Sequence, residues 1–330
     1  MKPFKVGIDS YGLKPLQFSP FEVLDWVLIN NGDGVQFSEV NLSPEQAADK
    51  TFLRELSQYA SENKLYLEWG GGEHIPLDFE KGVLKDIALI NRKAAEQANL
   101  LGVSIVRSCS GGLMRWQKDS LPAEDFLRMM AKSLKEQRQM FQDLRVVLAI
   151  ETHFEFTTFE LLRLFEMCGA EPTEYLGICL DTMNLLTMLE DPVRATQRIL
   201  PWVVSTHIKD GALLLTETGF VSFPVETGKG VVNFKEIFEL LSSLEHEITL
   251  SIEDHGGEFQ IPIFDAAFLE KFPGLSVAEL GGFLKLSVKS QKLLDEGKIS
   301  VLERSRWPKY CESRMKAGIQ HIKKIVRENR

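Results

Sequence analysis

Four strand-like segments in the second half of the chain each end in a residue that can bind a metal ion. The segments VVLAIE, LGICLD, VVSTH and ITLSIE close with Glu151, Asp181, His207 and Glu253. Each segment is short, apolar and rich in β-branched residues, which is typical of a strand buried on both faces. A buried carboxylate without a cationic partner is costly. The repeated endings therefore predict a cation at the point where these strands converge.

Three carboxylates and one imidazole favour a single divalent ion. Oxygen ligands suit Mn2+ or Mg2+, and the imidazole is also compatible with Co2+ or Zn2+, so we expect Mn2+ ahead of the other three. A structural zinc site would instead use thiolates in a closed tetrahedral shell. Four protein ligands leave coordination positions for substrate oxygens on a metal that takes five or six ligands.

The elements that would position these residues alternate between strand and helix patterns. The strand candidates cover residues 4–9, 34–40, 65–70, 104–110, 146–153, 176–182, 203–210 and 248–255. Eight strands, each followed by a helical segment, predict a (β/α)8 TIM barrel, in which the C-terminal strand ends meet at one mouth. A doubly wound open sheet is the alternative. It is disfavoured because polar residues end strands along the whole chain instead of at one switch point.

The pattern changes after the eighth strand. Proline-containing loops are followed by helical runs to the end of the chain, so we predict a barrel over residues 1–256 and a helical extension over 257–330. This extension would pack on the barrel or on a neighbouring subunit, and its apolar face makes a homo-oligomer possible.

The composition argues against several classes of partner. A net charge of −9 opposes a general affinity for nucleic acid or anionic membranes. No apolar run approaches the roughly 20 residues of a membrane span, and the N-terminus MKPFKVGID lacks the features of a signal peptide. The four cysteines are scattered without a CxxC pair. We therefore expect a reduced, cytoplasmic protein with a small-molecule substrate.

At the four candidate ligands the chain resembles the xylose isomerase-like TIM-barrel superfamily, which includes sugar isomerases, ketose 3-epimerases, inosose dehydratases and type IV AP endonucleases. The matching segments lie within residues 1–256 and are AIETHFEFTTFELLRLFE, GICLDTMN, STHIKDG, SIEDHGG and GKGVVNF. The resemblance implies that Glu151, Asp181, His207 and Glu253 are the ligands of a single metal. It also implies that Glu151 and Glu253 form the acid/base pair of the epimerase-like members.

The chain departs from the epimerase pattern at two places. Those enzymes carry Asp-x-x-His after the sixth strand, whereas this chain has Asn184 in place of the histidine. They also carry an arginine shortly after the histidine ligand, whereas residues 208–219 contain none. We expect Asn184 to donate to a substrate hydroxyl, and Lys209 to polarise a carbonyl or hold an anionic group.

Two further histidines follow the glutamate ligands at a spacing of two residues. His153 and Glu151 would point to the same side of their strand, so His153 is a candidate base, ligand support or substrate contact; a satisfied loop histidine is the alternative. His255 shares the side of Glu253 and would reach the mouth. Asp254 would face away from the mouth and have a structural role.

Other strand ends offer a possible sugar-binding surface. Trp69, followed by three glycines, predicts an aromatic platform for a sugar face, with a core tryptophan as the alternative. Arg107 would pair with Glu68 or Glu39, or bind a substrate oxygen.

These residues favour a metal-dependent isomerase or epimerase acting on a keto sugar or keto-polyol. Glu151 and Glu253 would move a proton beside a metal-bound carbonyl through an enediolate. The alternative is a dehydratase or lyase of the same superfamily, resembling an inosose dehydratase or an enzyme that eliminates from 3-keto-glycosides. An AP endonuclease is disfavoured by the acidic balance and by only six histidines. The complete ligand set disfavours a non-catalytic binding barrel.

Overall fold

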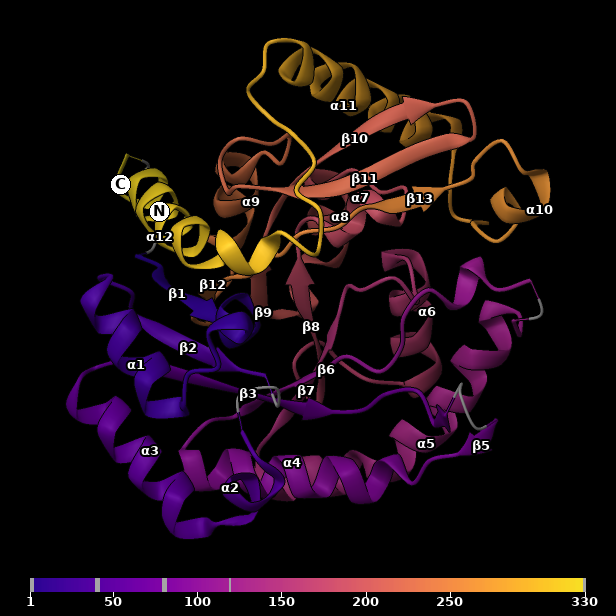
Figure 1. Ribbon diagram of the computed structural model, residues 1–330. Coiled ribbons are helices and arrows are strands. Elements are labelled where there is room, and N and C mark those ends of the chain that lie inside the picture. Colours follow the sequence, from indigo (N-terminus) through magenta and orange to yellow (C-terminus); the bar gives the residue numbers. More distant parts are fainter. Residues whose placement is uncertain (1–2, 39–41, 79–81, 119, 329–330) are drawn as a thin grey trace.

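The chain folds around a closed barrel of eight parallel strands (Figure 1). The computed structural model describes residues 3–38, 42–78, 82–118 and 120–328. Around the barrel the strands are β1 (Lys5–Asp9), β12 (Thr249–Ile252), β9 (Val203–Ile208), β8 (Leu176–Asp181), β7 (Val147–Glu151), β6 (Ile105–Ser108), β3 (Tyr66–Gly72) and β2 (Gly34–Phe37). Each overlaps one of the eight predicted strands, and helices surround them. The predicted TIM barrel is confirmed.

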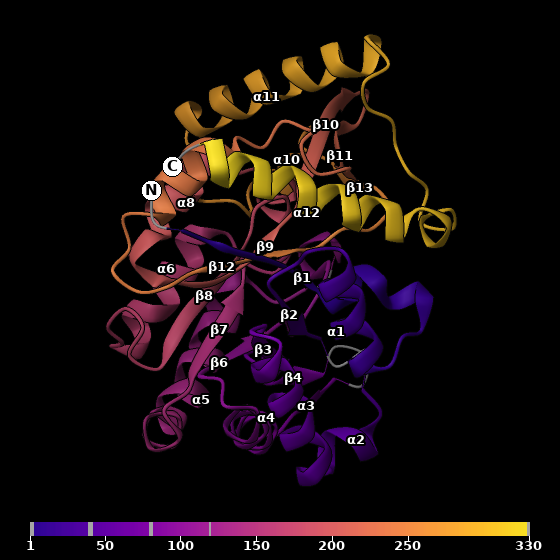
Figure 2. The same ribbon diagram turned by 90° about the vertical axis from the view of Figure 1, so that its left-hand side faces the viewer.

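Most of the helices follow a barrel strand and cover the outside of the barrel (Figures 1 and 2). The helices of the described residues are α1 (Pro20–Ile29), α2 (Pro44–Ala48), α3 (Lys50–Glu62), α4 (Ile87–Leu101), α5 (Ala123–Leu144), α6 (Thr158–Cys168), α7 (Asn184–Thr187), α8 (Pro192–Ile199), α9 (Phe234–Leu241), α10 (Ala266–Leu269), α11 (Val277–Asp295) and α12 (Cys311–Glu328). Strand and helix residues share one continuous hydrophobic core. Among the described residues, no helix combines the length and apolar character needed to cross a membrane.

Local sequence signals set the ends of α6, the helix that follows the Glu151 strand. Thr157 caps its first turn by accepting a hydrogen bond from the backbone N–H of Glu160, and the Glu160 carboxylate accepts one from the backbone N–H of Thr157. This reciprocal capping box satisfies two backbone donors that a helix start otherwise leaves free. Gly169 ends the helix in the left-handed conformation, with φ 58°, where glycine avoids a steric penalty.

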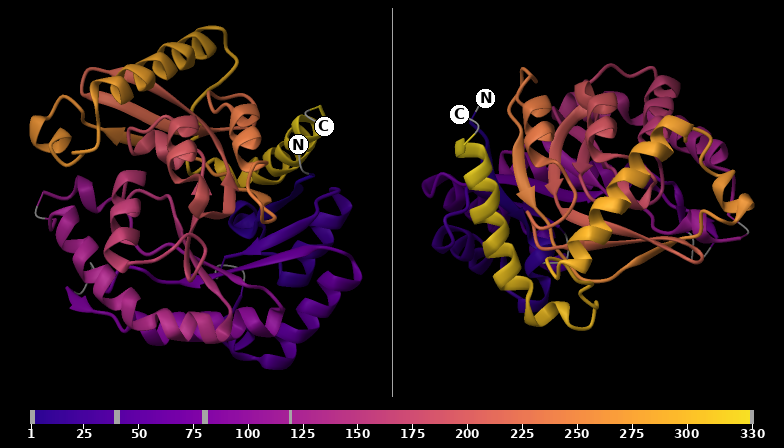
Figure 3. Two further views of the ribbon diagram at one scale, coloured as in Figure 1. Left: turned by 180° about the vertical axis from the view of Figure 1, so that it is seen from behind. Right: turned by 90° about the horizontal axis from the view of Figure 1, so that it is seen from above.

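A second, antiparallel sheet lies beside the barrel mouth. It consists of β10 (Asp210–Thr216), β11 (Gly219–Val225) and β13 (Phe259–Ile261), and α11 covers it (Figures 1 and 3). The sequence interpretation missed this sheet, because it ended the seventh strand at residue 210 and expected loops and helices afterwards. A further two-stranded hairpin joins β4 (Leu77–Asp78) and β5 (Val83–Leu84).

The last helix of the chain packs on the barrel wall. Helix α12 contacts β1 and β12 and lies next to α9, where the eighth outer helix of such a barrel belongs (Figure 1). The approach is close, because a Cβ at Gly318 would lie 3.1 Å from Ile252. At least this part of the extension therefore covers the barrel. The boundary between residues 256 and 257, and association between chains, stay predictions.

The GKGVVNF segment folds around a buried carboxylate at the start of β10. Asp210 accepts hydrogen bonds from the backbone amides of Gly228 at 2.9 Å, Gly230 at 2.8 Å and Val232 at 3.2 Å. The amide of Gly211 adds a fourth at 2.9 Å. These glycines therefore serve a turn that anchors the chain just beyond His207 and Lys209.

We expect Gly230→Ala to destabilise the protein, because the added Cβ would lie 2.2 Å from an oxygen of Asp210 and 2.3 Å from the carbonyl oxygen of Gly211. Chemical denaturation should show a loss of about 1–3 kcal/mol. Gly281→Ala is the matched control, since it lies in α11 with nothing within 4 Å of the new Cβ. It should be neutral or stabilising by up to about 1 kcal/mol. Equal stability of the two variants would contradict this account of the turn.

Candidate metal centre

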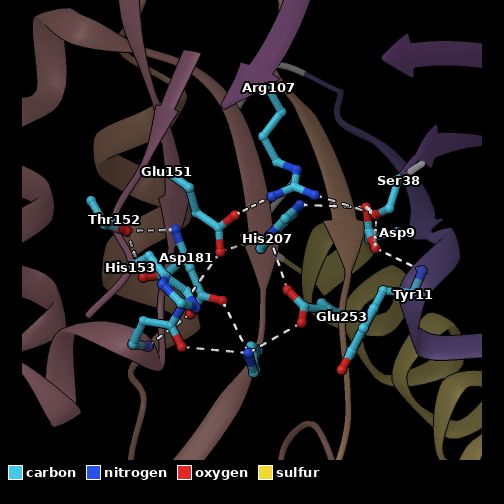
Figure 4. A network of polar contacts seen from close by, with 12 residues as sticks. Asp9, Tyr11, Ser38, Arg107, Glu151, Thr152, His153, Asp181, His207 and Glu253 are labelled. Atoms are coloured by element: carbon cyan, nitrogen blue, oxygen red, sulfur yellow. Dashed lines mark hydrogen bonds and ion pairs between the residues drawn. The ribbon is translucent and has the colours of Figure 1, made fainter. Parts of the chain in front are cut away.

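The four predicted ligands meet at the mouth of the barrel (Figure 4). One ligand atom from each of Glu151, Asp181, His207 and Glu253 lies within 4.8 Å of the others. All four residues are buried, with exposures of 8% or less. Strand register explains the convergence, because Asp181 and His207 are direct partners across β8 and β9, and Glu253 follows β12, which pairs with β9. The geometry of this group suits one metal ion.

The imidazole of His207 is oriented by a residue on the opposite side of the barrel. Its Nε2 donates to the amide oxygen of Gln36. The amide nitrogen of Gln36 in turn donates to Glu68 Oε2 at 2.6 Å and to Ser205 Oγ at 2.9 Å. An amide oxygen only accepts hydrogen bonds, so the proton sits on Nε2. This leaves the lone pair of Nδ1 facing the centre of the group.

The Nδ1 atom of His207 is placed to bind a cation. It lies 2.9 Å from Glu253 Oε2 and 3.5 Å from Glu151 Oε1, yet it makes no hydrogen bond of acceptable geometry to any described residue. Burial favours the neutral ring, but neighbouring groups led by Cys179 and Glu151 raise the pKa of His207 well above its ordinary value. A proton and a divalent ion would therefore compete for the same position.

The charge around the centre is unbalanced. Three carboxylates face two cationic side chains, with Arg107 Nη1 at 2.6 Å from Glu151 and Lys209 Nζ at 3.3 Å from both Asp181 and Glu253. Burial raises the pKa of Asp181 to about 6, although Lys209 acts in the opposite direction. For Glu151 and Glu253 burial also opposes ionisation, but neighbouring cationic groups hold the pKa of both carboxyls below the usual range. The remaining negative charge favours a cation, and a divalent ion would more than offset it.

A cavity of about 940 Å³ opens over this group. Most of the predicted site residues line it: Arg107, Glu151, His153, His207, Lys209, Glu253 and His255. Asp181 and Asn184 are fully buried beneath the cavity. Asn184 joins the polar network, because its amide donates to Glu151 at 3.4 Å and its oxygen accepts from Lys209 at 3.4 Å.

Trp69 does not form the predicted platform for a sugar. Its side chain is only 2% exposed, and its indole N–H donates to Gln97 at 3.2 Å. It lies in the hydrophobic core and does not line the cavity. The alternative of a core tryptophan therefore describes the position of Trp69.

Arg107 pairs with Glu151 instead of Glu68. Glu68 lies deeper in the barrel than the metal centre. There it accepts hydrogen bonds from Gln36, Ser205 and Thr249, and these four residues form a polar layer below the centre. The other predicted partner of Arg107, Glu39, lies outside the described residues.

The two histidines at the mouth have different environments. His153 Nδ1 lies 3.0 Å from Glu155; burial favours its neutral form, but Glu155 raises the pKa of His153 to about 9. His255 contacts the carbonyl oxygen of Gly256 at 2.8 Å, and burial lowers its pKa to about 3. Asp254 turns away from the mouth and forms a two-bond ion pair with Arg314 of α12, at 2.5 and 2.6 Å.

Sequence reasoning missed two residues near the ligands. Gln36 gives little signal, because a lone glutamine within an apolar strand does not show what it will contact. Asp9 could have been found, since it closes FKVGID as the ligands close their strands. Its carboxylate accepts hydrogen bonds from Ser38 at 2.8 Å and from the amide of Tyr11 at 2.7 Å, and lies 3.6 Å from His207 Nε2.

Solved structures with the same fold include enzymes and a metal-bound protein. The probable 3-DHS dehydratase AsbF of Bacillus anthracis is 17% identical with a TM-score of 0.57, covering 81% of this chain and 97% of its own. A D-allulose 3-epimerase from Methylomonas sp. is 13% identical with a TM-score of 0.61, covering 98% and 99%. A xylose isomerase-like TIM barrel protein from Mycobacterium smegmatis, in complex with magnesium, is 14% identical with a TM-score of 0.60, covering 86% and 98%.

Sequence comparison gives a more direct assignment. The uncharacterized protein YihM of Escherichia coli (strain K12) is 25% identical over 147 residues, which is 44% of this chain and 43% of that relative. The model of the xylose isomerase-like TIM barrel family matches residues 30–270, most of the barrel. The chain therefore belongs to the xylose isomerase-like TIM barrel family.

Proposed function

We propose that the protein is a metal-dependent isomerase or epimerase acting on a keto sugar or keto-polyol. The main support is the position of Glu151 and Glu253 on two sides of His207, with carboxylate oxygens 3.5 and 2.9 Å from its Nδ1 (Figure 4). The ionised carboxylate of one glutamate can take a proton from one face of a substrate carbon, and the other glutamate, in its protonated form, can return a proton to the opposite face.

Glu151, Asp181, His207 and Glu253 would hold the cofactor, one divalent ion. We propose Mn2+ ahead of Co2+, Mg2+ and Zn2+, because carboxylate oxygens predominate and one imidazole is present. Such an ion, when bound, polarises a carbonyl and stabilises the negative charge that develops on its oxygen.

The surrounding side chains prepare the two glutamates for different tasks. Arg107 holds one oxygen of Glu151 at 2.6 Å, which keeps this carboxylate ionised and fixes its direction. Glu253 is held more loosely, at 3.3 Å from Lys209. The Lys209 ammonium lines the cavity, so it would stabilise an enediolate oxygen by donating a hydrogen bond.

A dehydratase or lyase of the same family is the second candidate. It is favoured by His153, which lines the cavity and is held by Glu155 at 3.0 Å. After proton removal beside the carbonyl, a donor at this position could protonate a leaving group on the next carbon. Release of water or an aglycone from the substrate would favour this reaction over epimerisation.

We expect Gln36→Leu to weaken Mn2+ binding by about 10- to 100-fold, because the Nε2–H of His207 loses its acceptor and the ring is no longer held in the ligating tautomer. Ser205→Ala is the matched control. It alters the same buried layer but leaves the contact between Gln36 and His207 in place, so it should bind Mn2+ more tightly than Gln36→Leu. Equilibrium dialysis with metal analysis measures both affinities. Equal losses would show that general damage to the layer, and not the tautomer, controls binding.

We expect the Mn2+-loaded protein to exchange a substrate C–H proton with D2O across a panel of ketoses, keto-polyols and 3-keto-glycosides. Glu151→Gln and Glu253→Gln should each lower kcat for the complete reaction by about 10²- to 10⁴-fold. A variant that retains metal should still exchange the proton on its intact face. Asp181→Asn separates metal binding from proton transfer, since it removes a proposed metal ligand but leaves both glutamates in place. NMR would follow exchange alongside metal content; absence of exchange with every compound would overturn the proposal.

A further inference from the structure

An arginine from the far end of the chain lies in the wall of the catalytic cavity. Arg304 belongs to the segment between α11 and α12, and it lines the cavity together with Tyr11, His255 and Gly256. The cavity is the one that contains Glu151 and Glu253. The helical extension thus contributes a cationic side chain to the proposed substrate site.

The guanidinium of Arg304 is held in a fixed direction. Its Nη1 donates to the carbonyl oxygen of Gly256 at 3.2 Å, and its Nη2 donates to the hydroxyl of Tyr11. Its plane also lies against two aromatic rings, 4.6 Å from the centre of Trp307 and 5.5 Å from that of Tyr11. These two rings are stacked on each other, with centroids 5.7 Å apart. Such support reduces the entropy that the side chain loses when it binds a ligand.

The segment that carries Arg304 packs closely against the backbone of Gly256 and Gly257. A Cβ at Gly256 would lie 2.7 Å from the carbonyl oxygen of Leu302 and 2.9 Å from that of Glu303. The amide of Gly257 donates to the carbonyl oxygen of Leu302 at 2.8 Å. Since Gly256 is three residues after the ligand Glu253, these contacts fix Arg304 on the Glu253 side of the cavity.

The positive charge of Arg304 has no carboxylate partner among the described residues. The other two cations nearest the metal centre differ, because Arg107 pairs with Glu151 and Lys209 pairs with Asp181 and Glu253. A guanidinium has five N–H donors, and Arg304 uses two N–H groups on neutral acceptors. It retains donors and a full charge for a ligand.

We propose that Arg304 binds an oxyanion carried by the substrate, so that the substrates are keto sugars bearing a carboxylate or a phosphate. This inference rests on the proposed function, which places the reacting carbons between Glu151 and Glu253. Arginine binds both oxyanions through two parallel hydrogen bonds. A cavity of about 940 Å³ is near the upper end of the usual range for small-molecule sites, so it has space for such a group beyond the keto end.

Fructose, fructuronate and fructose 6-phosphate form a suitable test series, because they share a keto group and differ at one end. Calorimetry would give their affinities for the Mn2+-loaded full-length protein, and NMR in D2O would follow proton exchange. We expect at least one of the two anions to bind roughly 10- to 100-fold more tightly than fructose. Comparison of the two anions distinguishes a carboxylate from a phosphate.

Arg304→Gln should abolish this preference, so that neither anion binds more tightly than fructose. Arg304→Lys should retain part of it, because the charge remains without the planar pair of donors. Arg306→Gln is the matched control from the same segment; its guanidinium lies 5.9 Å from the Tyr310 ring and does not line the cavity. This control should keep the full preference. Parallel unfolding curves would separate lost binding from a loosened segment.

The outcomes separate this inference from the proposed function. Equal affinity of the wild-type protein for fructose and both anions, or a preference that survives Arg304→Gln, would overturn the role of Arg304. Exchange without an anion preference would retain the proposed function alone. Arg304-dependent anion binding without exchange would retain the binding site but remove the proposed reaction.

Discussion

The rest of the barrel mouth must offset the mutual repulsion of three buried carboxylates. Glu151, Asp181 and Glu253 approach one imidazole at positions where water cannot solvate them fully. Arg107 and Lys209 offset part of the charge through contacts of 2.6 to 3.3 Å. His207 Nδ1 makes no hydrogen bond to any described residue, so it stays available for an ion. The charge is therefore reduced while this nitrogen remains without such a partner.

A polar layer below the ligands makes this arrangement rigid. Gln36, Glu68 and Ser205 come from β2, β3 and β9 and form a connected set of hydrogen bonds inside the barrel. Burial raises the pKa of Glu68, although its three hydrogen-bond donors act in the opposite direction. The layer couples strands that are distant in sequence to the tautomer of His207. Closure of the barrel and the ability to bind a metal are thus linked physically.

The sequence predicted the convergence of the four candidate ligands, because each is local to its own strand. A short apolar run that ends in Glu151 or His207 indicates both a buried strand and a side chain that can bind a metal. Parallel strands then bring such ends together. The β10–β11 hairpin was less visible, since its first strand continues from β9 after only Lys209. Gln36 and Arg304 were not predictable in this way. Their roles depend on contacts with His207 and Gly256, which exist only after distant segments meet.

The four residues from Glu253 to Gly256 show how the end of the chain is joined to the centre. Glu253 faces the ligand group, while Asp254 points outward and pairs with Arg314 of α12. His255 lines the cavity, and Gly256 admits the segment that carries Arg304. Helix α12 also packs on β1 and β12. A change that loosens α12 would therefore affect the candidate ligand Glu253 and the cavity wall together, because Asp254 and Gly256 lie in the same short segment.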